Sequence, residues 1–160
     1  MTSLLLLVLA ATPTLEVEGA LVKRASFTVK DLQELGAVTV DWSDKRGPHK
    51  LTGVRLDKVL LKLGFTERPT GPQTDPKVKH QGLRAAVLAT AADGFEAVFS
   101  VGELLETLGP TQALLVWEMD GQPLPASTGP FRLVVTNDKG QSRSPHQLVS
   151  LKVIDLKTRQ

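Results

Sequence analysis

A chain of 160 residues with 41% hydrophobic residues is long enough to bury the core of one globular domain. Its 19 Lys and Arg residues nearly balance 17 Asp and Glu residues, and only 4% of its residues are aromatic, which argues against a nucleic-acid-binding surface. Cysteine is absent, which excludes disulfides, thiolate nucleophiles, iron–sulfur clusters and Cys-ligated zinc.

Residues 1–14 have the character of a secretory leader. A short apolar run at residues 4–9 is followed by two alanines and a proline, as in the apolar region and cleavage site of a signal peptide. The run is far too short to span a membrane, and the first basic residue is Lys23. We predict a signal peptide or leader over residues 1–14 and a periplasmic or secreted location. A buried N-terminal strand in a cytoplasmic protein is the alternative.

The chain after the leader begins with short predicted elements. Residues 15–21 alternate apolar and polar side chains, which is typical of a half-buried strand. Thr28 and Asp31 form the pattern of a capping box at the start of a short helix, and Gly36 is its expected stop. Period-two alternation at residues 37–42 predicts a second strand.

A charged segment and a second helix follow. Residues 43–52 contain several basic side chains around a Gly-Pro pair, and we interpret them as a loop. The helix is predicted by an apolar stripe at i, i+3, i+4 and i+7, made of Leu56, Val59, Leu60 and Leu63. Residues 65–81 are rich in Pro, Gly, Thr and charge and predict a long exposed loop.

The second half is mostly predicted strand. Asp-Gly pairs at residues 93–94 and 120–121 predict tight turns, and Ser100 with Glu103 predicts a helix start that runs to Gly109. The predicted strands are residues 83–90, 95–99, 113–119, 122–124, 131–135 and 148–156. Many short strands with three short helices predict an α+β domain with a mixed or antiparallel sheet.

Five segments, in the same order, resemble one enzyme family. They are LEVEGALVKRASFTVKDLQEL, TGVRLDKVLLKLG, AADGFEAVFSVGELL, WEMDGQPLPASTGPFRLVV and QLVSLKVIDL, and together they extend over residues 15–156. The sequence resembles the oxidoreductase molybdopterin-binding domain, the fold of sulfite oxidases and of periplasmic methionine-sulfoxide reductase catalytic subunits. The resemblance implies a single domain of the sulfite-oxidase-type fold over residues 15–160, with molybdopterin as the family's cofactor.

The resemblance also implies a metal ligand that this chain lacks. In the family one cysteine thiolate holds the molybdenum, because a soft, anionic sulfur stabilises such a centre. The corresponding strand end carries Asp41 and Trp42, and the sequence contains no cysteine. We therefore expect a non-catalytic domain without a metal cofactor, and pterin binding without the metal stays open. The alternative is a molybdopterin-dependent oxidoreductase in which Asp41 or water replaces the thiolate.

Seven residues are candidates for binding a pterin or another small anion. Basic side chains near the strand end would attract an anion, with a solvated basic loop as the alternative. Arg132, Arg143 and His146 are candidates because of the resemblance. It implies that a Gly-Pro-x-Arg stretch and the loop before the last strand lie at the pterin. The set is Asp41, Arg46, His49, Arg55, Arg132, Arg143 and His146.

The remaining patterns assign neither a metal site nor a catalytic residue. The histidines at positions 49, 80 and 146 lack the spacing of a metal-binding motif, so we predict no metal site. Neither a nucleophile elbow nor a phosphate-binding glycine-rich loop is present. We expect the partner to be a small anionic ligand or a protein, with residues 65–81 and the basic loop at residues 43–52 as the docking surface in the second case.

Overall fold

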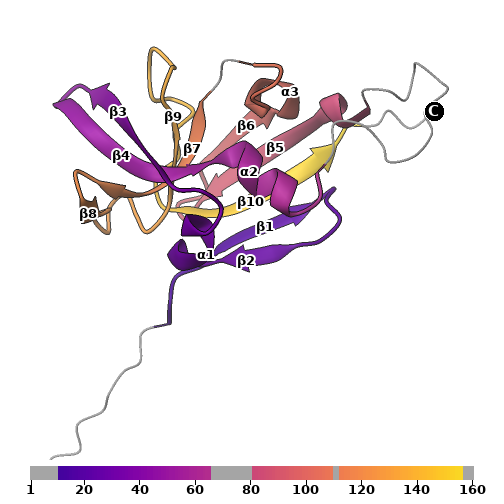
Figure 1. Ribbon diagram of the computed structural model, residues 1–160, viewed down its shortest axis with the longest axis horizontal. Coiled ribbons are helices and arrows are strands. Elements are labelled where there is room, and N and C mark those ends of the chain that lie inside the picture. Colours follow the sequence, from indigo (N-terminus) through magenta and orange to yellow (C-terminus); the bar gives the residue numbers. More distant parts are fainter. Residues whose placement is uncertain (1–10, 66–80, 110–111, 157–160) are drawn as a thin grey trace, which may run out of the picture.

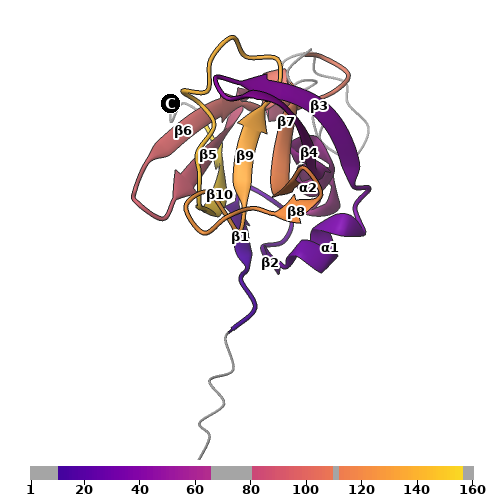
Figure 2. The ribbon, with the colours of Figure 1, turned by 90° about the vertical axis from the view of Figure 1, so that its left-hand side faces the viewer.

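The computed structural model describes residues 11–65, 81–109 and 112–156 (Figure 1). Most of the predicted leader and of the predicted 65–81 loop, with the histidine at position 80, lies outside these ranges. Within them, two five-stranded sheets form the body of the protein (Figures 1 and 2). This arrangement confirms the predicted α+β class with mixed and antiparallel sheets.

The first sheet is mixed, with strand order β2-β1-β10-β5-β6. Strands β1 and β10 pair in parallel, and the other neighbours are antiparallel. The strands are β1 (Leu15–Gly19), β2 (Ala25–Phe27), β5 (Ala85–Ala91), β6 (Glu96–Ser100) and β10 (Leu148–Asp155). The alternating and apolar runs of the sequence therefore form strands, as predicted.

The second sheet is antiparallel, with strand order β3-β4-β7-β8 and β9 paired to β7. The strands are β3 (Val38–Asp44), β4 (Gly47–Arg55), β7 (Ala113–Met119), β8 (Gln122–Pro123) and β9 (Arg132–Val135). Strand β7 has the predicted bounds, because its apolar run is limited on the C-terminal side by the Asp120-Gly121 turn.

The prediction of a loop at residues 43–52 is wrong. Strands β3 and β4 form a hairpin in which Asp44 pairs with Gly47, so the turn contains only Lys45 and Arg46. The Arg46 amide donates to Asp44 Oδ1 at 2.7 Å, and Gly47 has a φ of 131°, which favours glycine. Much of the hairpin is exposed to solvent, so its strands carry charged residues, and a charged segment is easily interpreted as a loop.

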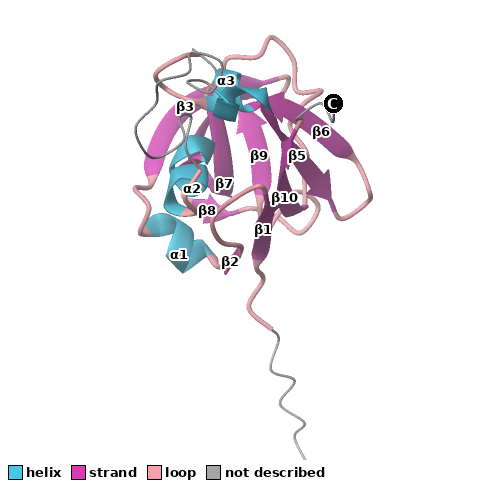
Figure 3. Ribbon diagram, turned by 90° about the vertical axis from the view of Figure 1, so that its right-hand side faces the viewer, coloured by secondary structure: helices cyan, strands magenta, loops and turns pink. Residues whose placement is uncertain are grey.

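The helices are short (Figure 3). They are α1 (Val29–Gln33), α2 (Leu56–Lys62), α3 (Val101–Leu104) and the 3₁₀ helix η2 (Gln81–Arg84). The Thr28 amide donates to Asp31 at 2.8 Å, which confirms the first capping box. Helix α3 ends before the predicted Gly109, because Leu105 adopts an extended backbone and buries its side chain in the core. No helix in the described ranges is long and apolar enough to cross a membrane.

Strand β7 separates two apolar clusters. Successive residues of a strand face opposite sides, so Leu115 and Trp117 join the main core while Leu114 and Val116 join a smaller cluster. The main core contains buried residues of both sheets and of helices α1, α2 and α3, whereas the buried residues of the smaller cluster come from the second sheet and from the segment between β8 and β9. The smaller cluster is completed by Trp42, Leu51, Leu124 and Val134.

Candidate functional site

A hollow of about 750 Å³ lies beside the smaller cluster, and Trp42 belongs to both. It is open to solvent and is lined by residues of the β3–β4 hairpin, the end of β7, the segment between β8 and β9, the start of β9 and the loop after β9. We call it the Trp42 pocket; it is lined by Trp42, residues 43–46, His49, Met119, Pro125, residues 127–128, Arg132, residues 138–142 and His146.

The hairpin register decides which predicted residues reach the Trp42 pocket. Trp42 pairs with His49, and their ring centroids lie 6.2 Å apart. Asp41 pairs with Lys50 on the opposite face of the hairpin, where Lys50 Nζ lies 2.8 Å from Asp41 Oδ1. The Asp41 side chain is 86% exposed and does not line the pocket. Of the two residues at the expected ligand position, only Trp42 therefore faces this site.

Arg132 is the most buried charged residue of the Trp42 pocket. Strand β9 places its guanidinium 5.3 Å from the centre of the Trp42 ring, and the residue is only 4% exposed. Its Nη2 donates to Gln141 Oε1 at 2.7 Å, whereas its Nε has no hydrogen-bond partner among the described residues. Burial lowers the pKa of Arg132, and the charge of Asp44 partly opposes this shift. The pocket thus contains a buried cation with an unused donor.

His49 is held between two carboxylates. Its Nδ1 lies 2.7 Å from Asp120 Oδ2, and its Nε2 lies 3.4 Å from Asp44 Oδ1. Hydrogen bonding to Asp120 raises the pKa of His49, and partial burial opposes this shift. The ring therefore carries a positive charge over a wider pH range than a free histidine does.

The pKa of His146 is shifted in the opposite direction to that of His49. Partial burial lowers the pKa of His146, and the nearby positive charge of Arg132 lowers it further. The pKa values of the two histidines of the Trp42 pocket are therefore shifted in opposite directions, upwards for His49 by its hydrogen bond to Asp120 and downwards for His146 by burial and Arg132.

Arg55 lies away from the Trp42 pocket, at the N-terminal end of α2. It forms ion pairs with Asp57 at 3.1 Å and with Glu106 at 3.9 Å. Asp57 is buried, so Arg55 has a structural partner of its own. The sequence did not predict the pairing of Arg55 with Asp57, in which Arg55 is the N-cap residue of α2 and Asp57 lies in its first turn.

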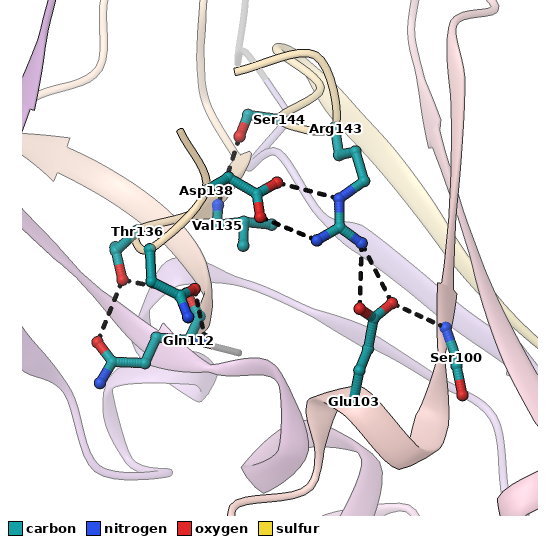
Figure 4. Close-up of polar contacts among 9 residues, drawn as sticks. Ser100, Glu103, Gln112, Val135, Thr136, Asp138, Arg143 and Ser144 are labelled. Carbon is teal, nitrogen blue, oxygen red and sulfur yellow. Dashed lines mark hydrogen bonds and ion pairs between the residues drawn. The ribbon is translucent and has the colours of Figure 1, made fainter. Parts of the chain in front are cut away.

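Arg143 also lies outside the pocket lining, although its neighbours in the chain belong to it. It forms ion pairs with Glu103 and Asp138 (Figure 4). The structure thus brings together four of the seven candidates, namely Arg46, His49, Arg132 and His146. The other three do not line the pocket: Asp41 and Arg55 are paired away from it, and Arg143 is paired with Asp138 of its lining.

Sequence reasoning missed the residues that hold these candidates in place. Gln141 binds the Arg132 guanidinium, and Asp120, interpreted only as a turn residue, binds His49. Asp120, which precedes a glycine at the end of a predicted strand, indicated the turn. Its partner His49 lies 71 residues earlier in the chain, so no local pattern could indicate the pair. Only the pairing of β4 with β7 brings the two together.

Comparison with known proteins identifies the family. The model of the oxidoreductase molybdopterin binding domain matches residues 38–159. The chain belongs to this family. A solved structure, the sulfane dehydrogenase SoxCD from Paracoccus pantotrophus, has 18% sequence identity to the chain and a TM-score of 0.60. The match covers 89% of this chain and 38% of the SoxCD chain, and it supports the sulfite-oxidase-type fold that the sequence predicted. No curated protein sequence matches the chain.

The Trp42 pocket fits an anionic group but not the family's metal–thiolate bond. Its lining contains four Lys and Arg residues and two Asp residues, and one of the four is the buried Arg132, whose Nε is unpartnered within the described part of the chain. The sequence contains no cysteine that could supply the thiolate. Among the described residues, no group of three His, Cys, Asp or Glu is placed to hold a metal ion. The phosphate of a pterin therefore suits this pocket, whereas the family's metal ligation does not.

Proposed function

We propose that the domain binds a small anionic ligand in the Trp42 pocket and does not perform the family's metal-centred oxidation. The observation that carries the proposal is the burial of Arg132, whose Nε has no hydrogen-bond partner among the residues that the structure describes. Family membership favours a phosphate-bearing pterin without its metal as the ligand. The proposal does not include the activity of SoxCD, because the match covers only 38% of the SoxCD chain.

The energetic argument concerns the cost of burying a guanidinium. A buried charge without a counter-charge is strongly unfavourable, and truncating one partner of a buried pair costs about 3–5 kcal/mol for the same reason. Asp44 is close enough to raise the pKa of Arg132, but its Oδ1 already accepts from the Arg46 amide. An anion at Arg132 would supply the missing charge, and the planar guanidinium suits the oxygen pairs of phosphate or sulfate.

A binding experiment tests the proposal. The full chain is titrated by calorimetry with inorganic phosphate, inorganic sulfate and a phosphorylated pterin. We expect saturable binding of at least one of these anions by the wild type and at least a tenfold loss of affinity in Arg132→Met, since a charge-assisted hydrogen bond contributes about 1.5–3 kcal/mol. Arg84→Met is the matched control, because Arg84 pairs with Asp155 away from the pocket. A wild type that binds none of the three anions would contradict the proposal.

The second candidate is a molybdopterin-dependent oxidoreductase with an unusual metal ligand, which family membership favours. The orientation of Asp41 away from the pocket gives no support to that residue as the ligand. Metal analysis of protein purified from its native host separates the two candidates. We expect no stoichiometric molybdenum; stoichiometric molybdenum with extractable pterin would favour the oxidoreductase.

Export to the periplasm or the medium is a further part of the proposal. It rests on the leader-like residues 1–14, of which the structure describes only residues 11–14. N-terminal sequencing of the protein from its native host tests it, and an intact Met1 would contradict cleavage.

A further inference from the structure

Arg143 connects one wall of the Trp42 pocket to helix α3 (Figure 4). Its Nε and Nη2 donate to the two carboxylate oxygens of Asp138 at 3.0 and 2.9 Å. Its Nη1 lies 3.2 Å from both carboxylate oxygens of Glu103, which also accepts a hydrogen bond from the Ser100 amide. The guanidinium carbon lies 5.1 Å from the centre of the Phe99 ring. Every nitrogen of this guanidinium therefore has a partner.

Asp138 is the reason why this arrangement matters to the Trp42 pocket. It belongs to the lining, three residues before Gln141, which holds Arg132. A free carboxylate here would repel an anion bound at Arg132, because the repulsion of two like charges falls only slowly with distance in a partly buried site. Both oxygens of Asp138 instead face the Arg143 guanidinium.

The other acidic residue of the lining, Asp44, also faces a hydrogen-bond donor and a histidine. Asp44 accepts from the Arg46 amide at 2.7 Å and lies 3.4 Å from His49 Nε2. Both carboxylates of the Trp42 pocket thus face a donor or a cation, while Arg132 Nε has no hydrogen-bond partner among the described residues. This asymmetry favours an anion and disfavours a cation as the ligand.

We infer that Arg143 is a charge-masking residue of the Trp42 pocket: it neutralises Asp138, so that an anion can bind at Arg132, and it does not touch the ligand itself. The inference rests on the proposed function, because masking changes affinity only if the pocket binds an anion. It replaces the role predicted from the sequence, in which Arg143 contacts the cofactor directly.

The test is a double-mutant cycle on the full chain, with inorganic sulfate as the probe and calorimetry at low ionic strength. Arg143→Met exposes the Asp138 charge, and we expect the affinity to fall about tenfold, the effect of one unit charge at several ångströms in a partly solvated site. In Arg143→Met/Asp138→Asn the charge is removed as well, and we expect the affinity to return to within about twofold of the wild type. Arg143→Lys retains the positive charge and should lose little affinity.

A merely structural role for Arg143 makes a different prediction. If Arg143 only holds the 138–142 wall in place, the double variant binds as weakly as Arg143→Met, and the masking role is overturned. Unchanged affinity in Arg143→Met overturns it too. Because Arg143→Met could also fail to fold, Asp138→Asn alone is the second variant. We expect it to bind sulfate as tightly as the wild type or more tightly; weaker binding would show that Asp138 supports the anion.

The wild-type titration separates the two proposals. If the wild type binds neither sulfate nor phosphate nor the phosphorylated pterin, the proposed function fails and the inference fails with it. If the wild type binds sulfate and the cycle shows no rescue, the proposed function stands and only the role of Arg143 is wrong.

Discussion

The two faces of the second sheet are built from the same strands, but one face forms the main core and the other carries the Trp42 pocket. On β9, Leu133 and Val135 pack into the main core, whereas Arg132 and Val134 lie on the other face. The inner face is covered by the first sheet, and the outer face carries a small apolar cluster and the charged Trp42 pocket. Changes on the inner face should therefore reduce stability, and changes around the pocket should reduce binding with little loss of stability.

The largest expected effect is on the inner face. Leu115→Ala removes a fully buried side chain from the main core, and we expect the free energy of unfolding to fall by about 2–5 kcal/mol. Urea denaturation followed by circular dichroism measures the change. The control Val98→Ala, at a position 59% exposed, should stay within about 0.5 kcal/mol of the wild type. A loss below about 1 kcal/mol in Leu115→Ala would refute the distinction between the faces.

Arg132→Met should have the opposite profile to Leu115→Ala. It replaces a buried guanidinium, whose Nε has no hydrogen-bond partner in the described ranges, by an apolar side chain. We therefore expect the free energy of unfolding to be unchanged or raised by about 1–2 kcal/mol. Anion binding should be lost in the same variant. Urea denaturation and calorimetry on one preparation measure both. A marked loss of stability would assign Arg132 to the structure and not to a ligand.

The two histidines of the Trp42 pocket should titrate on opposite sides of the usual value of about 6.5. Asp120 raises the pKa of His49, so the stability that His49 contributes is present below the unfolded pKa and is lost as pH rises through the folded value. Burial and Arg132 lower the pKa of His146, so its contribution is lost as pH falls through the folded value.

NMR of the imidazole protons measures both titrations. We expect Asp120→Asn to lower the pKa of His49 and Arg132→Met to raise that of His146, because each change removes a named neighbour. Coincident titration curves in the wild type would contradict the assigned environments.

The smallest expected effect is that of Asp41→Ala. Because this carboxylate is exposed and forms a surface ion pair with Lys50 across the hairpin, we expect neither sulfate affinity nor the denaturation midpoint to change measurably. Calorimetry and urea denaturation check the variant. Lost binding would bring Asp41 back as a ligand of the pocket.

Local sequence patterns predicted most helices and strands, and four of the seven candidate residues line the Trp42 pocket. The apolar stripe of α2, the Thr28 capping box and the Asp-Gly turns depend on residues only a few positions apart, so the sequence displays them directly. The β3–β4 hairpin was missed because its charged residues resemble a loop until their pairing is known. Arg132 and His49 were predicted as candidates, whereas their partners Gln141 and Asp120 were not.

The sequence by itself determined the family and the lack of a thiolate, because composition and motif order do not depend on folding. Tertiary structure alone decided which basic residues share the Trp42 pocket. The physical reason is that strand pairing alternates faces residue by residue: Trp42 is placed in the pocket and Asp41 outside it, although they are adjacent in the chain. Ion pairs with Glu103 and Asp138 occupy Arg143, whereas Arg132 Nε has no hydrogen-bond partner among the described residues.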